Sequence, residues 1–340
     1  MSAFRKLAMF TDIHFDEHGG SEEHNKNCLD FIDWFIDQSH DCDTLVFGGD
    51  WHHYRPKVNT PTLLPSYEGV KKLADTGKKI FWIIGNHDLP YLEKRDLHSL
   101  PFLKSFDNII IVDEPVLHED VLFVPWLTEN DDLGSIARTP ARYVFGHFEF
   151  PGFMMNQNYE MPDKDGILKS EQFENPEYVF CGHYHGRQFK QVKSGTWIHY
   201  IGNAFPHNFS DANDTDRGMM TLEYGSEPVY LNWPDMPKYT VVKASEIDDL
   251  KVGAKENVRL DDDIGLTDEE RLQLQSMIVE DFGALTAKVK PLKKQSVIDE
   301  AIIQEGEDIM AMVIRRLKET EEPQLDNSKL VDIFLNAEVI

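Results

Sequence analysis

Five short motifs rich in histidine, aspartate and asparagine recur along the first part of the sequence. In order, they are Asp-x-His, Gly-Asp, Gly-Asn-His-Asp, Gly-His and Gly-His-x-His. Each is weak evidence alone, because Asp, Asn and Gly are ordinary turn residues. A preference for turns does not explain the histidines among them, which are His14, His87, His147, His183 and His185. Together the motifs indicate metal binding and proton transfer, the two kinds of chemistry that these side chains perform best.

The motif side chains can be divided between two metal ions. Two divalent cations about 3.5–4 Å apart repel each other, and a carboxylate shared between them offsets that repulsion. Asp50 is the natural bridge. The remaining ligands are expected to be Asp12, His14 and His185 for one metal, and Asn86, His147 and His183 for the other. Mixed nitrogen and oxygen ligands favour Mn, Fe, Zn or Co over Mg.

Each motif directly follows a short run of apolar residues. The runs cover 7–10, 44–47, 80–84, 143–145 and 178–181. Continuous β-branched and aromatic runs are typical of buried strands, and apolar spacing predicts helices over 25–40 and 62–76. Alternating strands and helices predict an α/β fold with a largely parallel sheet, in which ligands gather at the carboxyl ends of the strands. The five motifs are therefore expected to lie close together.

Composition limits the class of protein. The 340 residues include 60 Asp and Glu against 34 Lys and Arg, a formal net charge of −26. This excludes a protein that holds nucleic acid by bulk positive charge, and a polybasic peripheral membrane protein. An odd count of three cysteines argues against a disulfide framework. With no apparent signal peptide or membrane span, we expect a cytoplasmic protein.

The pattern changes near Pro234 and Pro237. Segment 237–294 reads as a small α+β module, with strands at 239–243, 257–260 and 284–289 and a helix at 267–282. Two acidic, amphipathic helices are expected at 296–319 and 328–337. The expected domains are therefore 1–236, 237–294 and 295–340.

The ordered motifs resemble those of the calcineurin-like metallophosphoesterase superfamily over roughly residues 5–205. This resemblance implies a four-layer α/β/β/α sandwich, here with a small α+β capping domain and C-terminal helices. It also implies two-metal hydrolysis of phosphoesters, in which a bridging hydroxide attacks phosphorus. His87 would then protonate the leaving oxygen or stabilise the transition state, and Asp88 would orient His87.

Local stretches resemble the SbcD/Mre-type DNA repair nucleases within that superfamily. Residues 48–56, Gly-Gly-Asp-Trp-His-His-Tyr-Arg-Pro, carry the strongest likeness, and 124–126, 200–205 and 217–218 add to it. By this resemblance His53 is the second catalytic histidine, although a spacing one residue shorter leaves His52 as the alternative. Arg55, His52 and Arg187 are the candidate substrate-binding residues.

The resemblance also implies an activity and partners. These are exonuclease action on double-stranded DNA and endonuclease action on single-stranded DNA, within a recombination or repair complex. The two divalent metals would be Mn, with Mg as the alternative. The expected partners are DNA, a second copy of the chain and an SbcC/Rad-type ATPase. Segment 295–340 is the candidate ATPase-binding segment, unless its helices pack on their own domain. Size and spacing are most similar to phage members, which would act in the host cytoplasm.

Two other functions remain open. The chain could be another metallophosphoesterase, either a phosphatase or a cyclic-nucleotide phosphodiesterase, or a non-catalytic scaffold subunit. Protein phosphatases of the superfamily typically carry G-D-x-x-D-R-G, whereas Asp50 is followed here by WHHYRP. Degenerate scaffold copies lose metal ligands, whereas all seven positions are filled here. The absence of a P-loop excludes ATP hydrolysis by this chain itself.

Several further residues are given no part in the site. His207 is expected to be near it in sequence only, His24 is read as an ordinary core or surface residue, and 261–263 as a solvated acidic loop. Residues 51–100 carry a net positive charge although the chain as a whole is acidic, with eight basic residues against five acidic ones. We therefore expect weak, salt-sensitive DNA binding by the isolated chain, admitted at the metal site.

Overall fold

The computed structural model describes residues 2–156, 159–253 and 255–291. The predicted helices at 296–319 and 328–337 lie outside the described residues. Within the described ranges, no helix is long and apolar enough to cross a membrane. The three cysteines are free and buried.

The first sheet has six strands in the order β14-β13-β1-β2-β3-β4. Its parallel strands are β1 (Lys6–Phe10), β2 (Thr44–Phe47), β3 (Lys79–Ile83) and β4 (Ile109–Val112). Its antiparallel strands are β13 (Gly218–Glu223) and β14 (Val229–Asn232). The apolar runs of the sequence form β1, β2 and β3, which are buried because both faces of this sheet are covered.

The second sheet also has six strands, in the order β11-β12-β10-β7-β6-β5. Its parallel strands are β6 (Val121–Val124), β7 (Tyr143–His147), β10 (Tyr178–Gly182) and β12 (Trp197–Tyr200). Its antiparallel edge strands are β5 (Val116–His118) and β11 (Gln188–Gln191). The two sheets pack face to face: the rings of Phe81 on β3 and Phe123 on β6 stack with centroids 3.9 Å apart.

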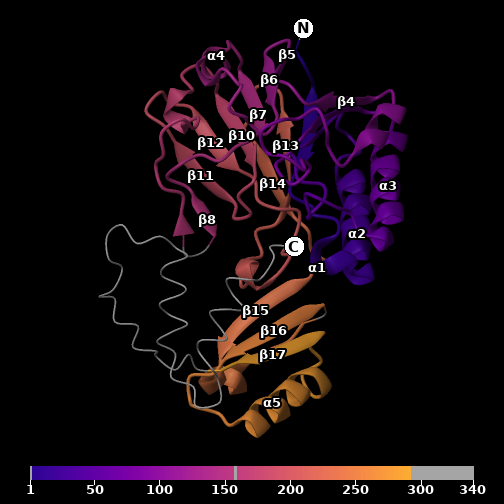
Figure 1. The fold of residues 1–340 in the computed structure, drawn as a ribbon, viewed down its shortest axis with the longest axis vertical. Helices are drawn as coiled ribbons and strands as arrows, with labels where there is room; N and C mark the ends of the chain where they lie inside the picture. The colour runs from indigo at the N-terminus through magenta and orange to yellow at the C-terminus, as the bar shows by residue number, and fades with distance from the viewer. Residues whose placement is uncertain (1, 157–158, 254, 292–340) are drawn as a thin grey trace, which may run out of the picture. The chain divides into compact units, whose positions relative to one another are not determined.

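Helices cover the outer face of the first sheet (Figure 1). The rings of Phe31 and Phe35 on α2 (Glu22–Gln38) pack against Phe10 of β1, and α3 (Thr60–Asp75) lies beside α2. The outer face of the second sheet is covered more thinly, by α4 (Leu133–Arg138), the 3₁₀ turn η2 (Ser170–Gln172) and loop side chains. The predicted α/β/β/α sandwich is confirmed, with loops making up much of its fourth layer.

The connections carry the smaller elements. These are α1 (Glu17–Gly20), η1 (Pro101–Ser105), β8 (Met154–Asn156), β9 (Tyr159–Glu160), η3 (Phe209–Asp211) and η4 (Ala244–Asp249). Helix α1 follows β1 and leads directly into α2. Short elements at the ends of the sheet strands therefore supply much of the surroundings of the motifs.

Residues 238–290 form a separate three-stranded parallel sheet with its own apolar core. It consists of β15 (Lys238–Lys243), β16 (Glu256–Asp261), α5 (Asp268–Glu280) and β17 (Thr286–Lys290). Helix α5 begins at the reciprocal capping box of Thr267 and Glu270. In the acidic run, Asp262 accepts backbone hydrogen bonds from residues 264–266 and pairs with Arg271. That carboxylate thus closes a turn.

Candidate metal centre

The five motifs meet where the carboxyl ends of strands from both sheets converge. The backbone N–H of His183, after β10, donates to the Asp12 carboxylate after β1, at 3.0 Å. The Nδ1 of His147, at the end of β7, donates to the Gly48 carbonyl after β2, at 2.9 Å. These bonds join the two sheets at the motif end. The sandwich therefore assembles one site from segments more than a hundred residues apart.

Four of the expected ligands have backbones in the left-handed region. Their φ angles are 50° at Asp12, 51° at His14, 61° at Asp50 and 94° at His183. Such a conformation costs a non-glycine residue about 1–3 kcal/mol and persists only where surrounding structure imposes it. It is concentrated at functional sites. In this chain the strain turns each side chain away from its strand and toward the site.

All seven predicted metal ligands lie together in two groups. Asp12, His14 and His185 place ligand atoms within 4.8 Å of one another, and Asp50, His147 and His183 do the same. The Asp50 Oδ2 is 3.8 Å from His14 Nε2 and 3.4 Å from His147 Nε2. Asp50 therefore reaches both groups, as a bridging carboxylate must.

Asn86 completes the second group. Its Oδ1 lies 2.9 Å from His147 Nε2 and 3.0 Å from His183 Nδ1. Because His147 Nδ1 gives its proton to a carbonyl, the Nε2 of the neutral ring carries a lone pair. That lone pair faces the oxygens of Asn86 and Asp50, an arrangement that a cation between them would stabilise.

Buried ring nitrogens also fit a bound cation. Both nitrogens of His14 and the Nε2 of His183 are buried without a hydrogen-bond partner in the described part of the chain. Burial, together with neighbouring histidines, lowers the pKa of His14 well below its usual value and that of His183 to about 3. Both rings are therefore neutral near pH 7, the form that binds metal.

His147 has the opposite balance. Burial lowers its pKa, but the charge of Asp50 outweighs burial and raises the pKa to about 9. Without metal, the Nε2 of His147 would therefore carry a proton where the metal ion would otherwise bind. Metal binding to the second group should release that proton.

Glycines give the strand ends the room that the site needs. A Cβ on Gly85 would lie 2.2 Å from Asp50 Oδ1, and one on Gly49 would lie 2.4 Å from His147 Nδ1. Gly49 also has a positive φ of 105°, which favours glycine for a second reason. Any larger residue at these positions would displace a candidate ligand.

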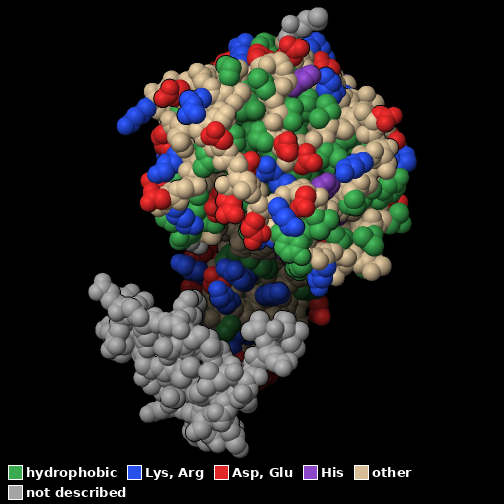
Figure 2. Space-filling view, turned by 45° about the horizontal axis from the view of Figure 1, so that its top comes forward, with side chains coloured by type: hydrophobic (Ala, Val, Ile, Leu, Met, Phe, Trp, Pro, Cys, Tyr) green, Lys and Arg blue, Asp and Glu red, His purple; other side chains and the backbone are tan. Residues whose placement is uncertain are grey.

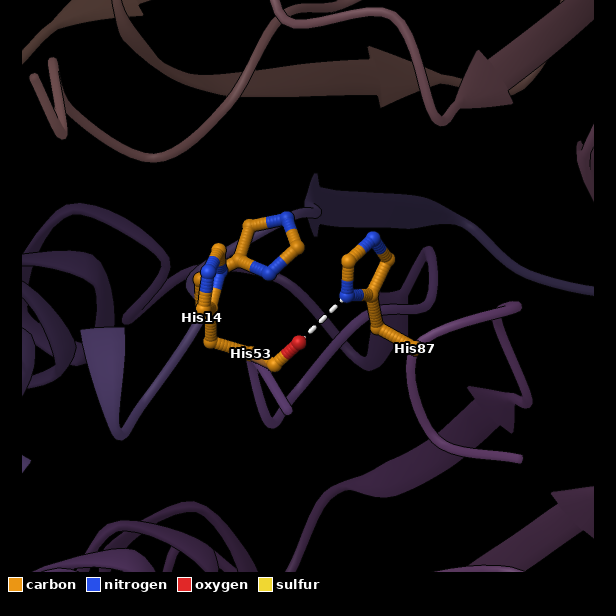
Figure 3. Close-up of side chains that lie close together, drawn as sticks. All are labelled: His14, His53 and His87. Atoms are coloured by element: carbon orange, nitrogen blue, oxygen red, sulfur yellow. Dashed lines mark hydrogen bonds between the residues drawn. The ribbon is translucent and has the colours of Figure 1, made fainter. Parts of the chain in front are cut away.

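The predicted catalytic histidines lie beside the first group of ligands. The rings of His53 and His87 stack at 5.5 Å, and each meets the ring of His14 edge to face, at 5.4 and 4.9 Å. In Figure 3 the three rings converge, and His87 Nδ1 donates to the His53 carbonyl. The free Nε2 of His87 is thus the ring nitrogen available for proton transfer.

Asp88 has a different role from the one predicted. Within the described ranges, its buried carboxylate makes no hydrogen bond with the His87 ring. It accepts instead from the backbone N–H groups of Asp50, Trp51 and Gly85, at 2.9–3.1 Å. The predicted orienting contact is wrong because the carboxylate faces inward, into the turn after β2. Burial and the charge of Asp50 raise its pKa to about 7. Asp88 therefore joins two ligand-bearing turns.

The geometry distinguishes the two adjacent histidines. Both ring nitrogens of buried His52 are hydrogen-bonded, to Ser99 at 2.7 Å and to Ser66 at 2.8 Å. The His52 ring therefore points into the interior of the protein, whereas the His53 ring lies at the site. The geometry favours His53 over His52 as the catalytic candidate and argues against substrate binding by His52.

The two arginines differ in how far they are already engaged. Arg187 donates to the Ile201 carbonyl at 3.1 Å and to Asn232 at 2.7 Å, and its guanidinium lies over Tyr230. These contacts give Arg187 a structural role, and its predicted substrate contact stays a prediction. The half-buried Arg55 has a buried Nε without a partner among the described residues, and its predicted substrate contact likewise stays a prediction.

His207 belongs to the site, contrary to the sequence-based expectation. Its fully buried ring lies 5.4 Å from that of His14 and 5.6 Å from that of His185. Its Nε2 donates to the Asp12 carbonyl at 2.9 Å. Nearby Asp211 lies 3.9 Å from His185 Nδ1. Both follow β12, a sixth strand that ends at the site, and that position was the sequence signal for them.

Comparison with known proteins agrees with this geometry. A family model described as calcineurin-like phosphoesterase matches residues 5–187. Exonuclease subunit 1 of Enterobacteria phage T4 is 26% identical over 194 residues, which cover 54% of each chain. The chain thus spans about half the length of that curated relative. A dimetal phosphatase from Danio rerio aligns at 10% identity and a TM-score of 0.42, over 67% of this chain and 95% of that one.

Proposed function

The chain belongs to the calcineurin-like phosphoesterase family, and on that premise we propose that it is a metal-dependent DNA nuclease of a recombination or repair complex. The observation that carries the proposal is the convergence of seven strand-end ligands into two groups that share Asp50. Family membership supports the coarser activity, metal-dependent phosphoester hydrolysis. The likeness to a phage exonuclease subunit supports DNA as the substrate.

The ligand groups assign a place to each metal ion. Asp12, His14, His185 and Asp50 would hold one, and Asp50, Asn86, His147 and His183 the other. When bound, the two cations supply a nucleophile at neutral pH and offset the charge that develops on the phosphate. The four neutral imidazoles and one amide keep the ligand charge low, at two carboxylates for two divalent ions. The centre would therefore stay net positive and attract a phosphodiester. Mn is the proposed metal.

His87 is the proposed proton donor. Its Nδ1 donates to the His53 carbonyl, which fixes the orientation of the ring. Its Nε2 is then free to protonate the leaving oxygen of the scissile phosphodiester. The His53 ring stacks on the His87 ring and helps to hold it in place. Half-buried Arg55 is the proposed contact to the DNA backbone.

The distribution of charge supports DNA binding at the metal site rather than over an extended surface. Figure 2 shows Lys and Arg interspersed with Asp and Glu over the larger part of the face in view, and several Lys and Arg gathered on the smaller part below it. The net charge of −26 opposes extended contact with a polyanion. DNA would therefore bind weakly, at the cations and nearby basic residues such as Arg55 and Lys57. Segment 295–340, outside the described residues, is the proposed contact for an SbcC/Rad-type ATPase that adds DNA affinity.

Removal of the bridging carboxylate tests this function. Asp50→Ala should abolish Mn-dependent nicking of circular single-stranded DNA, because both metals lose a ligand. The exposed Asp107→Ala is the matched control and should nick at the wild-type rate. Circular DNA has no ends, so nicking requires an endonuclease. Undiminished nicking by folded Asp50→Ala would refute the proposal, and phosphatase activity with no nicking by the wild type would favour the phosphatase alternative.

A further inference from the structure

A second cluster of ligand-type side chains lies beside the predicted metal pair. Glu17 of α1, His24 of α2 and His207 of the loop after β12 place ligand atoms within 4.8 Å of one another. Their residue exposures are 6%, 5% and 0%. The predicted pair uses none of the three, and His207 lies beyond the residues that match the family model. The cluster therefore combines two residues within the matched range with one beyond it.

Two backbone carbonyls fix how the histidines are protonated. His207 Nε2 lies 2.9 Å from the Asp12 carbonyl, and His24 Nε2 lies 2.9 Å from the His14 carbonyl. A carbonyl oxygen only accepts, so in each neutral ring the proton is on Nε2 and the lone pair is on Nδ1. Donation of one ring N–H to a carbonyl is also how metal-binding histidines are usually oriented.

Glu17 faces a nitrogen that has no proton to share. Its Oε2 lies 3.9 Å from His207 Nδ1, which is buried and without a hydrogen-bond partner within the described ranges. Asn208 donates to the other oxygen, Oε1, at 2.8 Å and holds the carboxylate in place. A lone pair and a carboxylate oxygen at this separation repel each other. One ion could bind both groups after they move slightly closer together, since each ligand lies about 2.0–2.2 Å from its ion.

We propose that Glu17, His24 and His207 bind a third divalent cation, separate from the predicted pair. Two imidazoles and one carboxylate are the donor set that Zn, Fe and Mn accept, with a fourth position left open. A cleft of about 320 Å³, lined by His24, Asn208 and Tyr239 among others, borders the cluster at His24. The ion would hold His207 against His14 and His185, and so support the first group of the pair.

Metal stoichiometry tests this site without reference to activity. The full chain is stripped of metal, reloaded with Zn²⁺, separated from free ion and measured by mass spectrometry of the metal. We expect about one zinc fewer per chain in Glu17→Gln, and in His24→Gln, than in wild type. Glu22→Gln, at an exposed position near the start of α2, is the control and should bind as much as wild type. An unchanged count in folded Glu17→Gln would overturn the proposal.

The number of zinc ions bound by the wild-type chain tests the third site even if a variant fails to fold. Three zinc ions per wild-type chain support the third site, and a saturated count of two overturns it. Asp50→Ala separates this proposal from the proposed function. That variant should lose zinc from the pair but keep the ion that depends on Glu17, so that adding Glu17→Gln lowers its count by a further one. No further loss in the double variant would contradict the third site, whatever happens at the pair.

Discussion

At the scale of single residues, the candidate centre depends on side chains whose surroundings determine their chemistry more than their type does. His52 and His53 are adjacent and identical in type, yet one is hydrogen-bonded to two serines and the other stacks on His87. Asp50 and Asp88 are both buried carboxylates. One reaches both ligand groups, and the other accepts backbone hydrogen bonds. Substitutions at each pair should therefore have different effects.

The adjacent histidines should give opposite results when replaced. His53→Gln should lower the single-turnover rate of DNA cleavage by about 10–100-fold while the thermal midpoint stays near wild type, because a ring beside the proton donor is lost. His52→Gln should instead lower the free energy of unfolding by about 1–3 kcal/mol, since buried Ser66 and partly buried Ser99 lose a partner. Cleavage kinetics and thermal unfolding of both variants check this. Loss of rate in folded His52→Gln with no loss in His53→Gln would reverse the assignment.

At the scale of elements, the strand ends and their turns position the ligands. The apolar runs and the ordered motifs were enough to predict β1, β2, β3, β7 and β10 and all seven ligands that the structure brings together, and the family resemblance added the sandwich. The apolar runs identify these strands because a parallel strand that is buried on both faces consists of consecutive apolar residues. His207 and Glu17 could not be placed in this way, since their positions depend on the paths of loops. The inward direction of Asp88 likewise depends on a neighbouring turn.

A glycine at a strand end gives a test of this positioning. Gly85→Ala should lower both metal affinity and the thermal midpoint, because the added Cβ would meet Asp50 within 2.2 Å. A clash of this kind costs about 1–3 kcal/mol. Gly186→Ala is the matched control, since no atom lies within 4 Å of its added Cβ and its φ is not positive. Metal titration and thermal unfolding measure both effects. Equal metal affinity and equal thermal midpoints in the two variants would contradict this role of Gly85.

At the scale of the whole molecule, α3 presents apolar side chains to solvent. Leu63, Leu64 and Tyr67 are 54%, 63% and 41% exposed. Contiguous exposed apolar surface on an otherwise charged protein indicates an interaction site. Self-repulsion by a chain of charge −26 would oppose association, so an apolar contact is the reasonable means of pairing. We propose that the second copy of the chain, expected from the resemblance, binds through the exposed face of α3.

Replacement on that face tests the dimer. Leu64→Glu should shift the mass in solution from two chains to one, because a charge would be buried in the contact. Leu272→Glu is the matched control, on α5 with 65% exposure, and should leave the mass unchanged. Analytical ultracentrifugation of both variants and wild type gives the answer. A wild-type monomer, or a Leu64→Glu dimer as stable as wild type, would contradict the use of α3.

The central claim is that the strand-end ligands hold two metal ions joined by Asp50. Anomalous diffraction from crystals of the intact chain soaked in Mn²⁺ tests it most directly. We predict two manganese peaks about 3.5–4 Å apart, one among Asp12, His14 and His185 and the other among Asn86, His147 and His183, with the Asp50 carboxylate between them. A fully soaked crystal with no peak in either group, or with a single peak that Asp50 does not contact, would contradict the account.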